Sequence, residues 1–93
     1  MILRYDPEFI DKLKKVDVKI RKSFKNKILV FSDNPDAPEL NNHPLREEWE
    51  GYRSIDVTND WRAVYTEKVE SGRITAFFVA LGTHRDLYNV RSQ

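Results

Sequence analysis

The sequence predicts an α+β domain in which two helices pack on one face of an antiparallel sheet. Apolar residues recur at helical spacing through the first third of the chain, and β-rich runs separated by short turns fill the second half. Two amphipathic helices need an apolar sheet face to bury, which gives two layers. At 93 residues, the chain is expected to form one domain over residues 1–93.

The first third is expected to hold a short strand, "ILRY", and then two tightly joined helices. Asp6 can cap the first helix and Pro7 suits its first position, while Asp17 can cap the second. Pro35 and Pro38, both within "SDNPDAP", cannot continue that second helix. The apolar positions that define the two helical faces are Phe9, Leu13, Val16, Ile20, Phe24, Ile28 and Phe31.

The second half is expected to form a three-stranded antiparallel meander. Residues 33–51 are the least regular segment, and "GYRSIDV", "WRAVYTE" and "ITAFFVAL" then follow, separated by the turn-like "TND" and "VESGR". The last run is apolar on both faces, so it is placed centrally in the sheet. Gly82 follows it and is expected to form the turn that ends this strand.

Composition excludes several classes of protein. The chain has no cysteine, which rules out disulfides, a thiolate metal site and a cysteine nucleophile. Its three glycines are too scattered for a phosphate-binding loop. No apolar run is long enough to span a bilayer and the N-terminus is not a signal peptide, so we expect a cytoplasmic protein without a membrane partner.

The net charge of +1 conceals a strong asymmetry along the chain. The segment from residue 33 to residue 60 contains eight acidic residues and only two basic ones, Arg46 and Arg53. Residues 11–27 reverse the balance, with two acids, Asp11 and Asp17, against eight basic residues: Lys12, Lys14, Lys15, Lys19, Arg21, Lys22, Lys25 and Lys27. This basic segment is either a surface for a polyanion or the solvated face of two helices.

The strand order predicts that several polar side chains meet at one edge of the sheet. In an antiparallel meander, the end of "ITAFFVAL" lies beside the start of "WRAVYTE" and the end of "GYRSIDV". Asp56 and the turn residues Asp60, Trp61 and Arg62 should therefore converge with "GTHRDLY", the segment that contains His84 and Tyr88.

This set of side chains fits cleavage of RNA without a metal ion. The reaction needs a base for the 2′-hydroxyl, an acid for the leaving oxygen and cations for the phosphate. His84 can act as acid or base and Asp60 as base, while arginines can hold the phosphate and aromatic rings can stack on bases. The candidate arginines are Arg53, Arg62 and Arg85, and the candidate rings are Trp61, Tyr65 and Tyr88.

Each candidate also has a purely structural interpretation. Asp60 can simply close a turn with Asn59, and Trp61 and Tyr65 point to one face of their strand, where core packing is favoured over RNA contact. The two histidines, His43 and His84, lack the local spacing of a metal site, so no metal or other cofactor is expected.

The order of motifs in "HPLREEWEGYRSIDVTNDWRAVY" and "FFVALGTHRDLY" resembles the RelE/ParE superfamily of bacterial toxins, most closely its YafQ-like branch. The resemblance implies a RelE-like fold and a toxin of a type II toxin–antitoxin pair. It further implies an mRNA interferase, an endoribonuclease that acts on mRNA at the ribosome and inhibits translation. Its partners would be an antitoxin, mRNA and the ribosome.

The resemblance also implies roles for individual residues. His84 of "GTH" matches the main general acid/base, His43 of "HPL" matches a histidine linked to activity, and Tyr88 matches an aromatic position near the RNA. Asp60 and Trp61 match an acid–aromatic pair. The chain departs from the branch at Asp56, where a histidine is usual, and at Arg62, which replaces an apolar residue and implies a compensating positive charge.

Two other hypotheses remain open at this stage. The chain could be a toxin of the same fold that poisons DNA gyrase, as in the ParE branch, although those chains generally lack the "GTH" and "NDW" set. It could also be an inactive RNA- or ribosome-binding module, a hypothesis for which Asp56 is the best support.

Overall fold

The computed structural model describes residues 1–88, so residues 89–93 of the predicted domain lie outside the described part of the chain. Its strands are β1 (Ile2–Tyr5), β2 (His43–Pro44), β3 (Arg53–Asp56), β4 (Trp61–Glu70) and β5 (Arg73–Thr83). Its α-helices are α1 (Pro7–Lys15), α2 (Val18–Asp33) and α3 (His84–Tyr88), and its 3₁₀ turns are η1 (Pro38–Leu40) and η2 (Glu47–Trp49).

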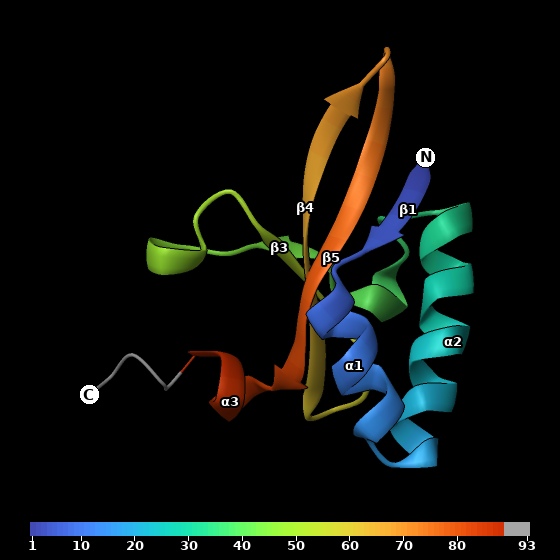
Figure 1. Ribbon diagram of the computed structural model, residues 1–93, viewed down its shortest axis with the longest axis vertical. Coiled ribbons are helices and arrows are strands. Elements are labelled where there is room, and N and C mark those ends of the chain that lie inside the picture. Colours follow the sequence, from blue (N-terminus) through green and yellow to red (C-terminus); the bar gives the residue numbers. More distant parts are fainter. Residues whose placement is uncertain (89–93) are drawn as a thin grey trace.

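The five strands form one sheet in the order β1-β5-β4-β3-β2. The predicted meander is confirmed, since β3, β4 and β5 pair antiparallel in sequence, and β5 lies between β1 and β4. The sheet as a whole is mixed, because β1 pairs parallel to β5. The pair β4–β5 continues past its neighbours as a long hairpin (Figure 1).

Helices α1 and α2 cover one face of the sheet, and α3 lies on the other side (Figure 1). The predicted caps are present, because the Asp6 carboxylate accepts a bond from the amide of Glu8 and Asp17 does the same for Lys19. Helix α2 ends at Asp33, just before the first of the two prolines.

The core lies between these two helices and the sheet. Its largest fully buried side chains include Phe9 and Phe31 from the helices and Tyr65 and Phe78 from the sheet. These rings contact one another, with the centres of Tyr65 and Phe78 5.1 Å apart. Burying rings of this size supplies much of the hydrophobic free energy that a small domain needs.

The end of β5 differs from the prediction. Gly82 does not form a turn, because the strand runs on to Thr83 and α3 begins at His84. Helix α3 folds back over Gly82 so closely that a Cβ there would lie 3.3 Å from the Cβ of Asp86. Gly82 therefore serves the packing of α3 rather than a turn.

Candidate functional site

The predicted segments do meet at one edge of the sheet. Asp56 of β3 lies directly opposite Arg62 of β4, and Trp61 lies opposite Thr83 of β5. The amide of His84 donates a hydrogen bond to the carbonyl oxygen of Asp60 at 3.1 Å. The start of α3 is thereby held against the turn between β3 and β4.

The pleat of the sheet then divides these residues between its two faces. Successive side chains of a strand point to opposite sides, while directly opposite residues share a side. His43 lies opposite Ser54. Asp56 is two positions beyond Ser54 on β3, so it points to the same side, and it lies opposite Arg62. All four side chains therefore belong to the face away from α1 and α2. Trp61 belongs to the helix face, where it packs against the core.

A pocket of about 340 Å³ lies on the face away from the two long helices. Its lining comes from β2 and the segments beside it, from β4 and from α3: Asn41, His43, Leu45, Arg62, His84 and Tyr88. Both histidines of the chain therefore open into one cavity although 41 positions separate them. The lining combines apolar, polar and aromatic side chains with one arginine, as ligand-binding sites commonly do.

One ring nitrogen of His43 has a defined partner in the structure. Its Nδ1 lies 2.8 Å from the carbonyl oxygen of Asn41. A carbonyl oxygen can only accept, so Nδ1 carries the proton, and in the neutral ring Nε2 is left as the basic atom. The short strand β2 fixes this residue, which the sequence had placed in an irregular segment.

His84 and Tyr88 lie one turn apart on α3. Their ring centres are 4.6 Å apart in an edge-on arrangement, and His84 is exposed to solvent. The hydroxyl of Tyr88 donates to the buried Ser54 Oγ at 3.2 Å, which anchors α3 to the sheet. His84 is thus held by its backbone and its neighbour while its imidazole remains open to the solvent.

Asp56 and Arg62 form a braced ion pair beside the pocket. Arg62 Nε lies 3.0 Å from Asp56 Oδ1. This oxygen is buried, and no donor among the described residues forms a hydrogen bond to it, so the contact is an ion pair. Arg62 Nη1 donates to the carbonyl oxygens of Thr58, Asn59 and Trp61 at 3.0, 3.1 and 3.2 Å. Much of the hydrogen-bonding capacity of this guanidinium is therefore used to hold the turn.

Apart from Asp56, which pairs with Arg62 beside the pocket, four further residues of the predicted site do not line it. Asp60 is exposed and reaches the site through its backbone, and Arg85 is exposed on α3. Trp61 faces the helices, where Lys12 Nζ lies 5.8 Å from its ring centre. Arg53 shares the helix side with Tyr65, and its Nε donates to Asn42 Oδ1 at 2.9 Å. None of these four residues therefore lines the pocket with the two histidines.

Sequence reasoning missed several residues that complete the site. Asn41 has a left-handed backbone with φ of 48°, which brings its carbonyl to His43, and Leu45 forms part of the wall. The indole of Trp49 in η2 donates to the carbonyl oxygen of Leu87 at 3.1 Å and so supports α3. The neighbouring asparagines of "NNHPL" were a usable signal for the turn, because asparagine tolerates this conformation.

Residues 1–88 contain neither a metal centre of the usual kind nor a helix that could span a membrane. No group of three or more histidine or acidic side chains in this part of the chain is arranged to hold a metal ion. None of its helices combines the length and apolar character needed to cross a bilayer.

Comparison with known structures shows the same fold in bacterial toxins. YafQ from E. coli superposes with a TM-score of 0.74 at 23% identity, covering 92% of this chain and 96% of YafQ. The YoeB/ParE toxin from Agrobacterium tumefaciens gives 0.72 at 20% identity, with 90% and 99% covered. The heterotetrameric YoeB–YefM toxin–antitoxin complex from Staphylococcus aureus gives 0.67 at 18%, with 90% and 97% covered.

Sequence comparison gives the family. No curated protein sequence matches the chain. The family model described as the ParE toxin of the type II toxin–antitoxin system parDE matches residues 3–88. This match runs from within β1 to the end of α3 and includes the histidine pocket. The chain therefore belongs to the ParE toxin family of type II toxin–antitoxin systems, within the RelE/ParE superfamily.

Proposed function

We propose that the protein is an endoribonuclease toxin that cleaves mRNA on the ribosome and thereby inhibits translation. The observation that carries the proposal is the pocket in which His43 and His84, from distant parts of the chain, stand with Arg62 and Tyr88. Two imidazoles can supply the base and the acid of the cleavage, so the protein itself provides both proton-transfer groups.

In the proposed reaction, the Nε2 atom of one neutral histidine removes the proton of a ribose 2′-hydroxyl. The 2′-oxygen forms a bond to the adjacent phosphorus while the bond from phosphorus to the 5′-oxygen breaks. The second, protonated histidine gives its proton to that leaving 5′-oxygen, so a cyclic phosphate and a free 5′-hydroxyl result. His43 fits the base because its Nδ1–H is already held by Asn41, and His84 then acts as the acid.

This assignment changes one of the roles that the residues themselves suggested. His43 replaces Asp60 as the proposed base, because Asp60 contributes its backbone to the site and does not line the pocket. Tyr88 is proposed to hold a base of the RNA by stacking, beside His84. The positive charge of Arg62 offsets the negative charge of Asp56. The aspartate therefore does not leave a net negative charge facing the phosphate.

The test is mRNA cleavage on translating ribosomes by purified protein, with cut positions mapped. His84→Ala and His43→Ala should each reduce cleavage about 10²–10⁴-fold, the usual contribution of a general acid or base. Asp86→Ala is the control, because Asp86 shares α3 with His84 without lining the pocket. Cleavage at the parent rate by a folded His84→Ala variant would refute the assignment.

The family match favours a second candidate, a toxin that acts on DNA gyrase as proposed for the ParE branch, because the family model carries the ParE name. A supercoiling assay separates the two. Inhibition of gyrase without cleavage of mRNA would favour the second candidate. Ribosome binding without either activity would instead indicate an inactive binding module.

An antitoxin is the proposed partner of this protein. Solved relatives include a toxin–antitoxin complex, YoeB–YefM from Staphylococcus aureus, whose toxin has the same fold. Co-purification of this chain with the product of an adjacent small reading frame would support the pairing.

A further inference from the structure

Asn42, the residue just before His43, uses both ends of its side-chain amide in hydrogen bonds. Its Nδ2 donates to the Tyr65 hydroxyl at 2.8 Å and to the carbonyl oxygen of Pro35 at 3.0 Å, and its Oδ1 accepts from Arg53 Nε at 2.9 Å. An arginine can only donate and a carbonyl oxygen can only accept, so the amide has one possible orientation. We call Asn42 with these three partners the asparagine clamp.

The clamp is anchored in the rigid part of the fold. Tyr65 is only 1% exposed, and the centre of its ring lies 5.0 Å from that of Phe31 in α2 and 5.1 Å from that of Phe78 in β5. Arg53 lies directly opposite Tyr65 on the neighbouring strand β3. The side chain of Asn42 is therefore tied to the packed core, where displacement of a ring would cost many contacts.

The backbone around His43 needs such support from outside. Strand β2 consists of His43 and Pro44 alone, and proline has no N–H to donate to the sheet. Asn41, just before the clamp, has a left-handed backbone with φ of 48° and ψ of 46°, which is uncommon for a residue other than glycine. Local pairing is therefore a weak constraint here, and the side chain of Asn42 supplies the stronger one.

A single peptide group connects the clamp to the ring of His43. Nδ1 of His43 donates to the carbonyl oxygen of Asn41 at 2.8 Å. This carbonyl and the backbone nitrogen of Asn42 belong to one peptide unit, which is planar. Holding Asn42 therefore also holds the oxygen that accepts from His43. Because the hydrogen bond of one ring nitrogen sets the tautomer of a histidine, the clamp determines which nitrogen is free as a base.

We infer that Asn42 is a positioning residue for His43 in the proposed cleavage of mRNA. It keeps the neutral imidazole in the form that carries its proton on Nδ1, so that Nε2 is the basic atom. The inference rests on the proposed function, because it takes His43 as the base. It also gives Arg53 a place in the clamp instead of the contact with phosphate that its charge suggested.

The direct test is the tautomer of His43, measured from the nitrogen chemical shifts of its ring in the isotope-labelled full chain. The pH is set high enough to keep the imidazoles neutral. We expect the Nδ1–H form in the parent and a mixture of both forms in Asn42→Ala. His84, on α3, is the internal reference, and its signals should not change. An unchanged tautomer of His43 in folded Asn42→Ala would overturn the inference.

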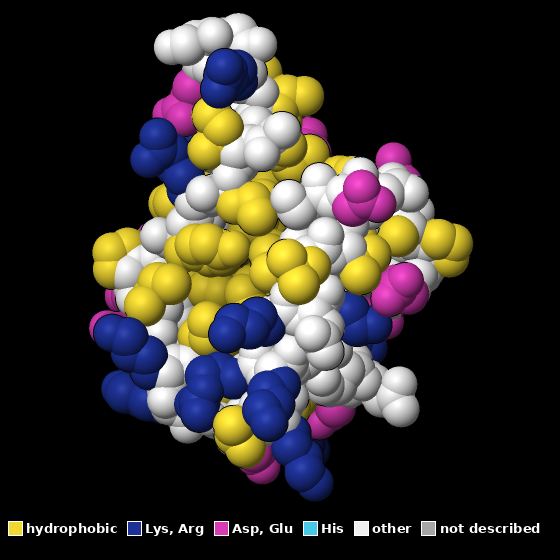
Figure 2. Space-filling view, turned by 90° about the vertical axis from the view of Figure 1, so that its right-hand side faces the viewer, with side chains coloured by type: hydrophobic (Ala, Val, Ile, Leu, Met, Phe, Trp, Pro, Cys, Tyr) yellow, Lys and Arg dark blue, Asp and Glu magenta, His cyan; other side chains and the backbone are white. Residues whose placement is uncertain are grey.

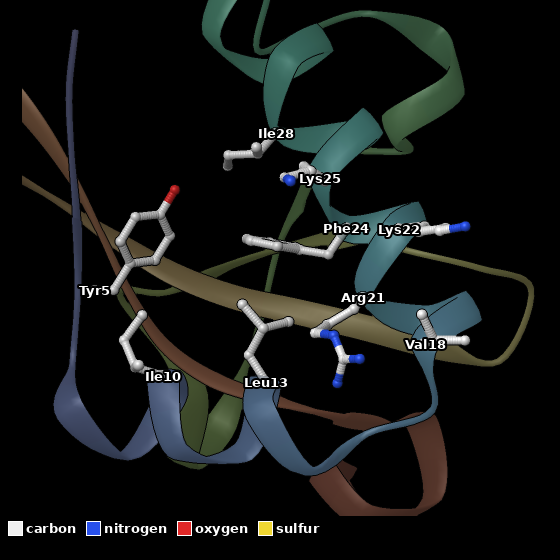
Figure 3. A pocket seen from close by; sticks show the side chains of 9 residues that line it. All are labelled: Tyr5, Ile10, Leu13, Val18, Arg21, Lys22, Phe24, Lys25 and Ile28. Carbon is white, nitrogen blue, oxygen red and sulfur yellow. The ribbon is translucent and has the colours of Figure 1, made fainter.

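Two tyrosines provide a matched pair of milder variants. Tyr65→Phe removes the hydroxyl that accepts from Asn42 and keeps the ring in the core. Tyr5→Phe is the control. Tyr5 also packs on Phe78, with ring centres 5.7 Å apart, but its hydroxyl lies in a hollow between α1 and α2 (Figure 3). That hollow has apolar walls and opens on the side of the molecule that carries these helices (Figure 2).

Tyr65→Phe should shift the tautomer of His43 part of the way, because the other bonds of the clamp remain, and Tyr5→Phe should not shift it. Circular dichroism confirms that each variant is folded. If Asn42→Ala does not fold, the two tyrosine variants carry the same test. Equal shifts in Tyr65→Phe and Tyr5→Phe would show a general loosening of the core and would overturn the inference.

Cleavage kinetics on translating ribosomes separate positioning from substrate binding. Asn42 does not line the histidine pocket, so Asn42→Ala should lower kcat and leave KM nearly unchanged. The expected loss is on the order of 10²-fold, the cost of displacing a catalytic group by about 1 Å. Asn42→Asp can still accept from Arg53 and from the Tyr65 hydroxyl, so it should regain part of this loss.

Thr66→Val is the control for a lost hydrogen bond at a distance from the clamp. The Thr66 hydroxyl donates to the carbonyl oxygen of Gly51 at 2.9 Å and so joins β4 to the loop before β3. Its removal should leave both kcat and the tautomer of His43 unchanged. A loss of kcat in Thr66→Val as large as that in Asn42→Ala would show that any loosening of this region has the same effect, and would overturn the inference.

The remaining outcomes keep the inference apart from the proposed nuclease. A changed tautomer in Asn42→Ala, with no cleavage by the parent, would refute the nuclease and leave the effect of Asn42 on His43 supported. Cleavage by the parent with an unchanged tautomer in Asn42→Ala would overturn the inference and leave the nuclease supported. A raised, salt-sensitive KM in Arg53→Gln with the tautomer unchanged would return Arg53 to phosphate binding and overturn its place in the clamp.

Discussion

Removal of the Arg62 side chain tests whether the braced ion pair beside the pocket holds the site together. In Arg62→Ala, Asp56 Oδ1 loses the cation 3.0 Å away, and the carbonyl oxygens of Thr58, Asn59 and Trp61 lose their shared donor. The side chains of Arg62 and Asp56 are only 17% and 25% exposed, so water replaces these partners incompletely.

The magnitude of the loss can be worked from the distance and the burial. At 3.0 Å and an effective dielectric constant of about 20, the attraction is roughly 332/(20 × 3.0), or about 5.5 kcal/mol before desolvation is subtracted. Removing one partner of a fully buried pair costs about 3–5 kcal/mol. Partial exposure lowers this figure, and we expect a loss of about 2–4 kcal/mol from a total of roughly 5–14 kcal/mol for a chain of this length.

The assay is urea denaturation followed by circular dichroism, with a double-mutant cycle. Asp56→Asn, Arg62→Ala and the double variant give the coupling energy of the pair, expected at about 1–3 kcal/mol. Arg62→Lys keeps the charge but loses the planar fork, so an intermediate stability is expected. A loss below about 0.5 kcal/mol in Arg62→Ala, the size of an ordinary surface substitution, would refute the brace. Lost cleavage at unchanged stability would instead support the phosphate-binding role that the sequence suggested for Arg62.

Tyr88→Phe should destabilise the protein by about 1–2 kcal/mol, because the buried Ser54 Oγ loses its donor, and denaturation should show no such loss for Tyr52→Phe. High pH should also destabilise it, since burial raises the pKa of both Tyr5 and Tyr65 above the ordinary value of 10.0. The unfolded chain releases these protons first, so the stability is fully present below pH 10 and falls as pH rises toward the folded pKa values, by up to about 1.4 kcal/mol per unit per tyrosine. Denaturation midpoints measured across this range check the slope, and a slope unchanged in Tyr65→Phe would contradict the role of Tyr65.

Much of the fold could be read from local sequence signals. Asp6, Pro7 and Asp17 marked the helix starts, and "ITAFFVAL" marked an interior strand because it is apolar on both faces. Parallel pairing of β1 with β5 could not be read in this way, since it depends on where α1 and α2 return the chain. The two-residue strand β2 was equally invisible, because so short a pairing depends on β3 being in place.

For the site, the sequence determined which chemical groups are present and which end of the sheet they share. Strand alternation alone brought Asp56, Arg62 and His84 to one edge. Tertiary structure decided which of them face the same space, because the pleat sends Trp61 to the core side and Arg62 to the pocket side. It also brought in His43, through a backbone turn at Asn41 and a pairing across 11 positions to Ser54. The face of the sheet to which a side chain points depends on the register of its strand. That register is fixed only when the whole core packs.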